Sequence, residues 1–149
     1  MEDDFIHFKL FKQVSWTTIY ISESGGCLMI NQRFRIRYPQ SSVTYNKKAH
    51  SAYPHYRISH IPTPNATFNF YPHRAVALTY LPIPSVFHTQ VDHLDGNIFN
   101  NNLWNLEWVT PEENYRRAKE AKKRKEKEAE DKRDQEILAY YETHRYTGD

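Results

Sequence analysis

Residues 91–114 read VDHLDGNIFNNNLWNLEWVTPEEN, and the predicted fold is organised around this stretch. Its first residues predict a strand that ends in the polar pair Asp92 and His93. Asp95-Gly96 follows, a dipeptide that favours a tight turn because glycine adopts a positive φ at no steric cost. The chain therefore leaves the strand through a turn into a polar loop. The asparagines of this loop are Asn97, Asn100, Asn101, Asn102 and Asn105.

The second half of the stretch predicts another strand and then a helix. The short apolar run Leu106 to Val109 follows the loop, and we expect its Trp108 to lie in the core. Thr110 supplies a capping hydroxyl, Pro111 occupies the first helical position, and Glu113 completes a capping box. The stretch as a whole predicts the order strand, turn-rich loop, strand, helix.

Three side chains of this stretch have the chemistry of a metal-assisted hydrolase. Asp92 and His93 end the first strand, and Asn114 lies in the first turn of the helix. If the helix packs across the hairpin, the three groups converge. A carboxylate and an amide oxygen are hard ligands that suit Mg²⁺ or Mn²⁺ better than zinc. A neutral histidine beside them can act as a general base, a combination typical of phosphodiester cleavage.

The same residues resemble the HNH endonuclease motif in its H-N-N form, as in phage and intron-encoded nicking and homing endonucleases. The matching strings are DHLDGN, NNN and NLEWVTPEEN. The resemblance implies that His93 is the base and that Asp92 and Asn114 hold one divalent ion, Mg²⁺ or Mn²⁺. It implies that Asn105 braces the loop and orients the base. It covers roughly residues 53–118 and implies an α+β protein with a ββα-metal (His-Me finger) nuclease core.

The asparagines also have a simpler interpretation, because runs of asparagine commonly form turns. Catalysis is favoured because the candidate residues occur together with the tight turn and the helix start. We assign the remaining loop asparagines to hydrogen bonding within the loop rather than to the metal: Asn97, Asn100, Asn101 and Asn102.

Composition limits the class of protein. A chain of 149 residues forms one domain with a modest core and room for an appendage. Cys27 is the only cysteine, so neither a disulfide framework nor a paired-cysteine zinc scaffold is expected. No apolar run is long enough to span a membrane, and no leader pattern is present. We expect a soluble, cytoplasmic protein, in a bacterial host cell if the gene belongs to a phage.

The net charge of +2 is unevenly distributed. Residues 116–127 hold eight basic and two acidic side chains, and Arg116 and Arg117 begin this run. A basic run beside a predicted phosphate-cleaving site is where contacts with the backbone of double-stranded DNA are expected. From there to Glu136 the chain lacks Gly and Pro, which predicts a long, solvated, charged helix. Apolar residues at 137–141 could dock on the body, meet a partner or pair two chains.

Upstream of the motif the pattern predicts mainly strands. Alternation in residues 5–38 favours strands, with Glu23 to Gly26 as a hairpin turn. The polar stretch from Pro39 to Pro54 predicts a loop or linker. Two further strands and a short helix are expected over residues 56–60, 67–71 and 73–80.

Four arginines upstream of the motif are candidates for DNA contacts. Arg33, Arg35 and Arg37 share one face of an alternating stretch, and they either grip phosphates or form an ordinary solvated basic face. We weigh these two possibilities evenly. Arg74 is a further candidate, whereas the neighbouring His73 is expected to cap and pack.

These observations divide the chain into three regions. We expect a β-rich region at 1–52 that can contact DNA, a nuclease core at 53–118 and a charged helical extension at 119–149. The predicted function is a metal-dependent DNA endonuclease of phage or homing type that nicks one strand. Two alternatives stay open: a nucleic-acid-binding module without turnover, and an assembly or interaction protein that acts through the charged helix.

Overall fold

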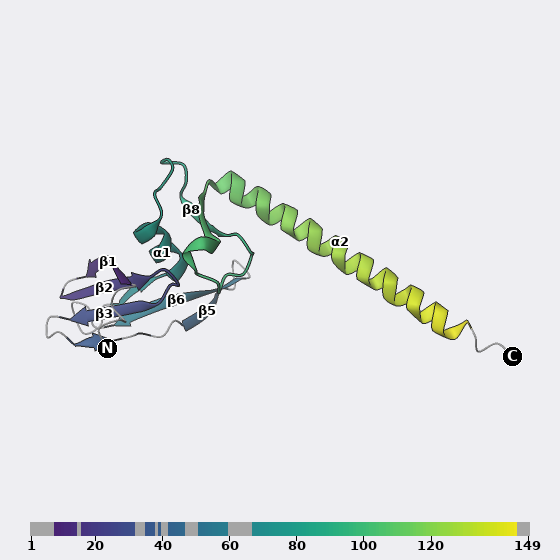
Figure 1. The fold of residues 1–149 in the computed structure, drawn as a ribbon, viewed down its shortest axis with the longest axis horizontal. Helices are drawn as coiled ribbons and strands as arrows, with labels where there is room; N and C mark the ends of the chain where they lie inside the picture. Colours follow the sequence, from purple (N-terminus) through teal and green to yellow (C-terminus); the bar gives the residue numbers. More distant parts are fainter. Residues whose placement is uncertain are drawn as a thin grey trace. The chain divides into compact units, whose positions relative to one another are not determined.

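A computed structural model describes residues 8–14, 16–31, 35–37, 39, 42–46, 51–59 and 67–145. The chain forms two compact units, which divide between Thr110 and Pro111 (Figure 1). The first unit holds the described strands and a short α-helix, and the described part of the second is a single long helix. The architecture is α+β, as predicted.

The described N-terminal strands are β1 Phe8–Val14, β2 Thr17–Ser22, β3 Cys27–Asn31 and β4 Ile36–Arg37. They form an antiparallel sheet in the order β1-β2-β3-β4. Ile21 pairs with Cys27 across the β2–β3 hairpin, and the amide of Gly25 donates to the carbonyl of Ser22 at 3.0 Å. Gly25 has a φ of 86°, a left-handed conformation that glycine adopts without strain. The predicted hairpin turn at residues 23–26 is therefore confirmed.

A second antiparallel sheet has the order β5-β6-β7, with β5 Ser42–Asn46, β6 Ser51–Ser59 and β7 Thr67–Phe70. The predicted loop or linker from Pro39 to Pro54 is wrong over β5 and the start of β6. Proline normally argues against a central strand because it cannot donate to the ladder. Here β6 pairs with β5 over residues 51–55 and with β7 only over residues 56–59. Pro54 therefore has a partner strand on one side only, and no bond to β7 is lost.

The remaining elements follow the predicted order. They are α1 Pro72–Tyr80, β8 Gln90–His93, the short 3-10 helix η2 Leu103–Asn105, β9 Leu106–Val109 and α2 Pro111–His144. Strands β8 and β9 pair as an antiparallel hairpin, and Thr110 alone separates β9 from α2. The order strand, loop, strand, helix is confirmed.

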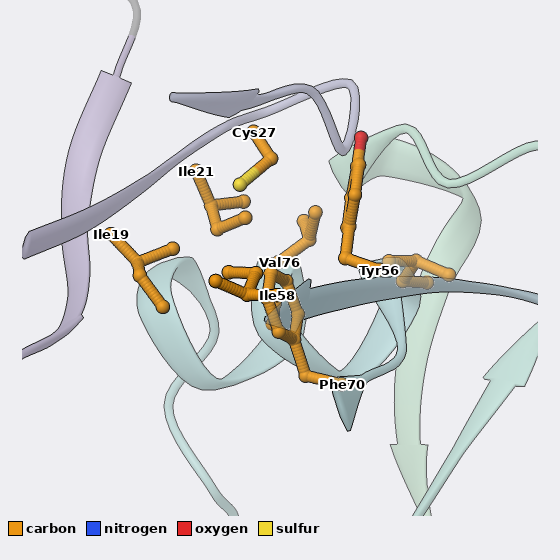
Figure 2. Close-up of a cluster of buried hydrophobic side chains, with 9 residues drawn as sticks. Ile19, Ile21, Cys27, Tyr56, Ile58, Phe70 and Val76 are labelled. Atoms are coloured by element: carbon orange, nitrogen blue, oxygen red, sulfur yellow. The ribbon is translucent and has the colours of Figure 1, made fainter. Parts of the chain in front are cut away.

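The hydrophobic core of the first unit lies between the two larger sheets and α1 (Figure 2). Strands β2 and β3 of the predicted N-terminal region and strands β6 and β7 of the predicted nuclease core contribute to this one cluster. The first residue of β9 contributes as well. Burial raises the pKa of the Cys27 thiol to about 12, so this cysteine is a core residue rather than a reactive one. The buried members are Ile19, Ile21, Cys27, Tyr56, Ile58, Phe70, Ala75, Val76 and Leu106.

Helix α2 is 34 residues long and has no buried residue. Ion pairs between side chains four residues apart run along it, such as Lys122 with Glu126 and Arg124 with Glu128. The predicted long, charged, solvated helix is confirmed. Within the part of the chain that the structure describes, no helix combines the length and the apolar character needed to cross a membrane.

Candidate active site

The hairpin β8–β9 presents the two candidate residues that end the first strand. His93 pairs with Leu106, and Asp92 pairs with Glu107. Successive side chains of a strand lie on opposite faces. His93 is only 7% exposed and shares its face with the buried Leu106 and Trp108, whereas Asp92 is half-buried on the other face. The expectation that Trp108 lies in the core is confirmed.

The loop between these strands is organised around the carboxylate of Asp95. Its Oδ1 accepts from the Asn97 amide at 2.8 Å and from Asn105 Nδ2 at 2.9 Å, and its Oδ2 accepts from Asn100 Nδ2 at 2.7 Å. These hydrogen bonds, led by the one from Asn100, hold the pKa of Asp95 below its usual value. Gly96 follows with a φ of 70°, and its amide donates to the carbonyl of His93 at 2.8 Å. The predicted tight turn at Asp95-Gly96 is confirmed.

Asn105 closes this loop from its far end. The side chain is 1% exposed, and its Oδ1 accepts from the Asp95 amide at 3.0 Å. Its Nδ2 donates both to Asp95 and to the carbonyl of Asn100, the latter at 2.8 Å. Its own carbonyl accepts from the amide of Leu94 at 2.9 Å. These contacts are those of a residue that braces the loop, as the sequence suggests for Asn105.

The imidazole of His93 is contacted by a different asparagine. Its Nε2 lies 3.2 Å from Oδ1 of Asn101, and both side chains are buried. The sequence pattern predicts only hydrogen bonds within the loop for Asn101. The family resemblance implies instead that Asn105 orients the base. Three consecutive asparagines carry no local signal that separates the one facing the histidine from its neighbours. Asn101 is the functional candidate that the sequence missed.

His73 packs directly behind His93. Its ring centroid is 5.1 Å from that of His93 and 5.7 Å from those of Tyr53 and Tyr71, and its Nδ1 is buried without a hydrogen-bond partner. The N-cap residue of α1 is Tyr71 and has no side-chain capping bond, so His73 packs but does not cap. Burial lowers the pKa of His73 to about 3, and the charges of His93 and Arg74 act in the same direction.

This buried histidine should make the protein less stable in mild acid. In the unfolded chain His73 takes up a proton as the pH falls below 6.5, whereas in the folded protein it stays neutral down to about 3. Stability is therefore lost as the pH falls through this window and regained as it rises. From about pH 7.5 to about pH 5 the free energy of unfolding should fall by about 2 kcal/mol. Urea unfolding at both pH values measures it.

The variant His73→Phe isolates this contribution, because it keeps a ring in the aromatic cluster and removes a nitrogen that has no partner. The difference between the two pH values should shrink by about 2 kcal/mol in the variant. An equal loss in the variant and the wild type would show that His73 is not the group responsible.

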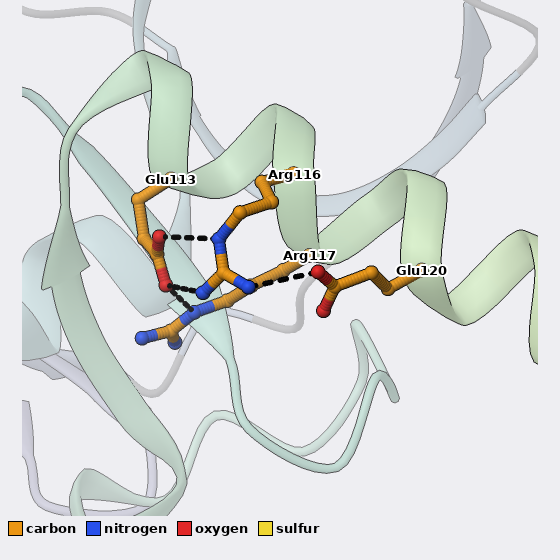
Figure 3. Close-up of polar contacts among 4 residues, drawn as sticks. All are labelled: Glu113, Arg116, Arg117 and Glu120. Atoms are coloured by element: carbon orange, nitrogen blue, oxygen red, sulfur yellow. Dashed lines mark hydrogen bonds and ion pairs between the residues drawn. The ribbon is translucent and has the colours of Figure 1, made fainter.

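The first turns of α2 carry Asn114 and a set of arginines. Arg116 bonds Glu113 with Nε and Nη2 at 3.0 and 2.7 Å, and Arg117 Nε lies 2.7 Å from Glu113 (Figure 3). Arg116 also bonds Glu120 at 2.8 Å. The hydrogen bonds from Arg116 and Arg117 lower the pKa of Glu113 to about 2. The two arginines thus have carboxylate partners within the helix, with which a phosphate would compete.

The other arginines predicted to contact DNA occupy different settings. Arg35 and Arg37 are exposed, and Arg37 lies in the short strand β4. Arg33 lies outside the described residues. Arg74 donates from Nη1 to the carbonyl of Thr89 at 3.0 Å and lies 5.8 Å from the centre of the Trp108 ring. Arg74 therefore ties α1 to the entry of β8, and a phosphate contact by it stays a prediction.

The two residues predicted to hold a divalent ion are Asp92, which carries a carboxylate, and Asn114, which carries an amide oxygen. Both are the hard oxygen donors that Mg²⁺ and Mn²⁺ prefer, so the chemistry of the pair fits such an ion. Across the described ranges, no three side chains of the His, Cys, Asp or Glu type gather into a potential metal-binding cluster. Asn114 belongs to none of these residue types, so the predicted pair of ligands stays a prediction.

Comparison with known proteins bears on the same elements. The HNH endonuclease family matches residues 71–116. An uncharacterized HNH endonuclease of Acanthamoeba polyphaga mimivirus is 42% identical over 59 residues, which are 40% of this chain and 18% of that relative. The fold of this chain is similar to a solved structure of the HNH homing endonuclease I-HmuI, which describes DNA binding and cleavage by that enzyme. The TM-score is 0.53 and the sequence identity is 22%. That match covers 78% of this chain and 59% of the I-HmuI chain, and it concerns the fold.

The chain thus spans about a fifth of the mimivirus relative and somewhat over half of the I-HmuI chain. The family match covers α1, the β8–β9 hairpin with its loop, and the first turns of α2. These elements carry Asp92, His93, Asn105 and Asn114. Residues 71–116 therefore match the HNH endonuclease family, and the chain has an α+β fold of the ββα-metal type.

Proposed function

We propose that this protein is a metal-dependent DNA endonuclease that nicks one strand of a duplex. The observation that carries the proposal is the buried His93 at the end of β8, held at Nε2 by Asn101 within the segment that matches HNH endonucleases. The described DNA binding and cleavage by the structurally similar I-HmuI supports DNA as the substrate. One site in one chain acts on one strand, which favours nicking unless two chains pair.

In the proposed reaction His93 removes a proton from water. The water oxygen forms a bond to phosphorus while the bond to the 3′ oxygen breaks. Asp92 and Asn114 are the proposed ligands of one Mg²⁺ or Mn²⁺, which when bound supplies positive charge at the phosphate. The hydrogen bonds among Asp95, Asn100 and Asn105 keep the loop in one conformation, so the base does not have to be ordered during the reaction.

The arginines that the sequence pattern predicts to contact DNA keep that role as part of this proposal. Arg35 and Arg37 are exposed, and Arg116 and Arg117 stand at the start of the basic run in α2. Such contacts bind the phosphate backbone without reading its sequence. A phage or homing-type origin and action in the cytoplasm of a bacterial host also belong to the proposal.

The test is the conversion of supercoiled plasmid to open circles by the full chain, with Mg²⁺ or Mn²⁺ and with EDTA. Open circles should form with the ion and not with EDTA, while a gel shift of the same DNA persists in EDTA. A protein that shifts DNA but leaves the plasmid supercoiled with both ions would instead be a binding module of the same fold.

Helix α2 offers a second, independent measurement. Residues 119–127 include six basic side chains, and the logarithm of DNA affinity falls with the logarithm of salt concentration by about 0.9 for each phosphate contact. Deletion of residues 119–149 should therefore reduce the steepness of this slope, log affinity against log salt concentration, by roughly 2–4, while plasmid nicking persists. Fluorescence anisotropy at several salt concentrations measures the slope.

Deletion of residues 128–149 is the matched control, because it shortens the helix but keeps the basic run. This shorter deletion should leave the slope unchanged or make it steeper, since residues 128–149 hold seven acidic and three basic side chains. If the longer deletion leaves the salt slope and nicking intact but abolishes self-association or partner binding, the helix serves assembly instead.

A further inference from the structure

The contact between Asn101 and His93 determines which imidazole nitrogen is free to act. The Asn101 amide has two partners, and its Nδ2 donates to the carbonyl of Phe99 at 3.4 Å. Its Oδ1 faces Nε2 of His93, at 3.2 Å. An amide oxygen only accepts hydrogen bonds, so the neutral imidazole must carry its proton on Nε2 and keep its lone pair on Nδ1.

Asn101 lies close against the turn of the N-terminal hairpin. A Cβ added at Gly25 would lie 2.9 Å from Cβ of Asn101, closer than such atoms approach one another. The turn is fixed on both sides of this contact. The carbonyl of Glu23 accepts from the amide of Leu103 at 2.7 Å, and the carbonyl of Gly25 accepts from the hydroxyl of Tyr56 at 2.9 Å. The turn therefore lies directly against the loop that carries Asn101.

We propose that Asn101 is a positioning residue that fixes the tautomer and orientation of His93, and that Gly25 provides the space that allows it. This inference rests on the proposed function for its catalytic meaning. It gives the N-terminal hairpin a second role besides any contact with DNA: residues 23–26 support the active-site loop. The geometry itself is independent of metal and substrate, so it can be tested without either.

The first measurement is the tautomer of His93 in the metal-free full chain, from long-range ¹H–¹⁵N NMR spectra. The His93 signal is assigned by its disappearance in His93→Ala. In the wild type the proton should lie on Nε2. In Asn101→Leu, which removes the acceptor, this preference should be lost, whereas Asn101→Asp retains an acceptor and should retain it. A wild-type proton on Nδ1 overturns the proposal even if no variant folds.

The second measurement is nicking. Asn101→Leu should lower kcat by about 10- to 100-fold, as loss of a supporting hydrogen bond behind a functional histidine does, with KM little changed. Asn102→Leu is the matched control. Its amide bonds Asn100 at 2.6 Å and not the imidazole, so its kcat should stay within about twofold and the tautomer should not change. A full kcat in folded Asn101→Leu contradicts the proposal.

Gly25→Ala tests the support from the hairpin. It should reduce the Nε2 tautomer preference and kcat in the same way, because the new methyl group displaces Asn101. Gly96→Ala is the control for backbone strain in the NMR measurement. Gly96 also has a positive φ, of 70°, but a Cβ there would meet nothing within 4 Å. Equal tautomer signals in Gly25→Ala and the wild type would remove the hairpin from the proposal.

The outcomes separate this inference from the proposed function. A wild type that does not nick, but whose Nε2 tautomer depends on Asn101, keeps the positioning role and refutes the nuclease. A wild type that nicks, with the same kcat and tautomer in Asn101→Leu, keeps the nuclease and refutes the positioning role.

Discussion

His93→Ala should lower the rate of plasmid nicking by about 10²- to 10⁴-fold, the usual contribution of a positioned general base. The described β8–β9 hairpin carries one titratable ring, the imidazole of His93, at the end of β8. Asn101 orients this imidazole. In the proposed reaction this imidazole takes the proton of the attacking water, so the substitution removes the base. DNA affinity in EDTA should stay within a few-fold, because phosphate contacts and not the base supply it. Single-turnover nicking and anisotropy measure the two effects.

His88→Ala is the control for this substitution. His88 lies in the segment between α1 and β8, where its Nδ1 is 2.8 Å from the Ser85 hydroxyl, and it has no proposed part in the chemistry. The control should nick at the wild-type rate. If His93→Ala folds, binds DNA and nicks within threefold of wild type, another group is the base and the assignment of His93 is wrong.

Asn105→Ala should have the largest effect on stability among the loop residues, with a fall in the free energy of unfolding of about 2–4 kcal/mol. The change removes the acceptor of the Asp95 amide and the donor to the carbonyl of Asn100, and it leaves a cavity at a side chain that is 1% exposed. Nicking should fall as well, because the loop that carries Asn101 is no longer closed. Urea unfolding and the nicking assay on one preparation measure both.

The same substitution at Asn97 provides the comparison. Asn97 is exposed, and its side chain accepts only from the Phe99 amide at 3.1 Å among the described contacts, so Asn97→Ala should cost under about 1 kcal/mol. Two variants that lose stability equally would show that Asn105 does not brace the loop more than an exposed turn residue does.

The local parts of the fold could be predicted because their causes are local. Gly25 and Gly96 mark turns through their positive φ, and both turns lie where the sequence put them. Proline at the first helical position and an unbroken run of helix formers predicted α2. The polar composition of the segment from Pro39 to Pro54 is typical of a loop, but β5 and the start of β6, with Pro54, lie there. The sheet tolerates Pro54 because β7 pairs with β6 only beyond it, and this depends on how the strands pair.

The candidate site could likewise be predicted from the sequence only in part. The spacing of Asp92, His93, Asn105 and Asn114 was enough to indicate the family, and the bracing contacts of Asn105 lie within the loop itself. The roles of these residues in catalysis and metal binding remain predictions that the experiments above address.

The sequence by itself determined the hairpin, the turn, the helix start and the chemistry of the candidate side chains, because each depends on residues a few positions apart. Only the tertiary structure decided that Asn101 faces the imidazole of His93 and that Gly25 lies against Asn101. Residues 25 and 101 are brought together by the shared core of the sheets and α1, not by any local pattern. Contacts of this kind depend on how whole elements pack, and a short motif does not encode that packing.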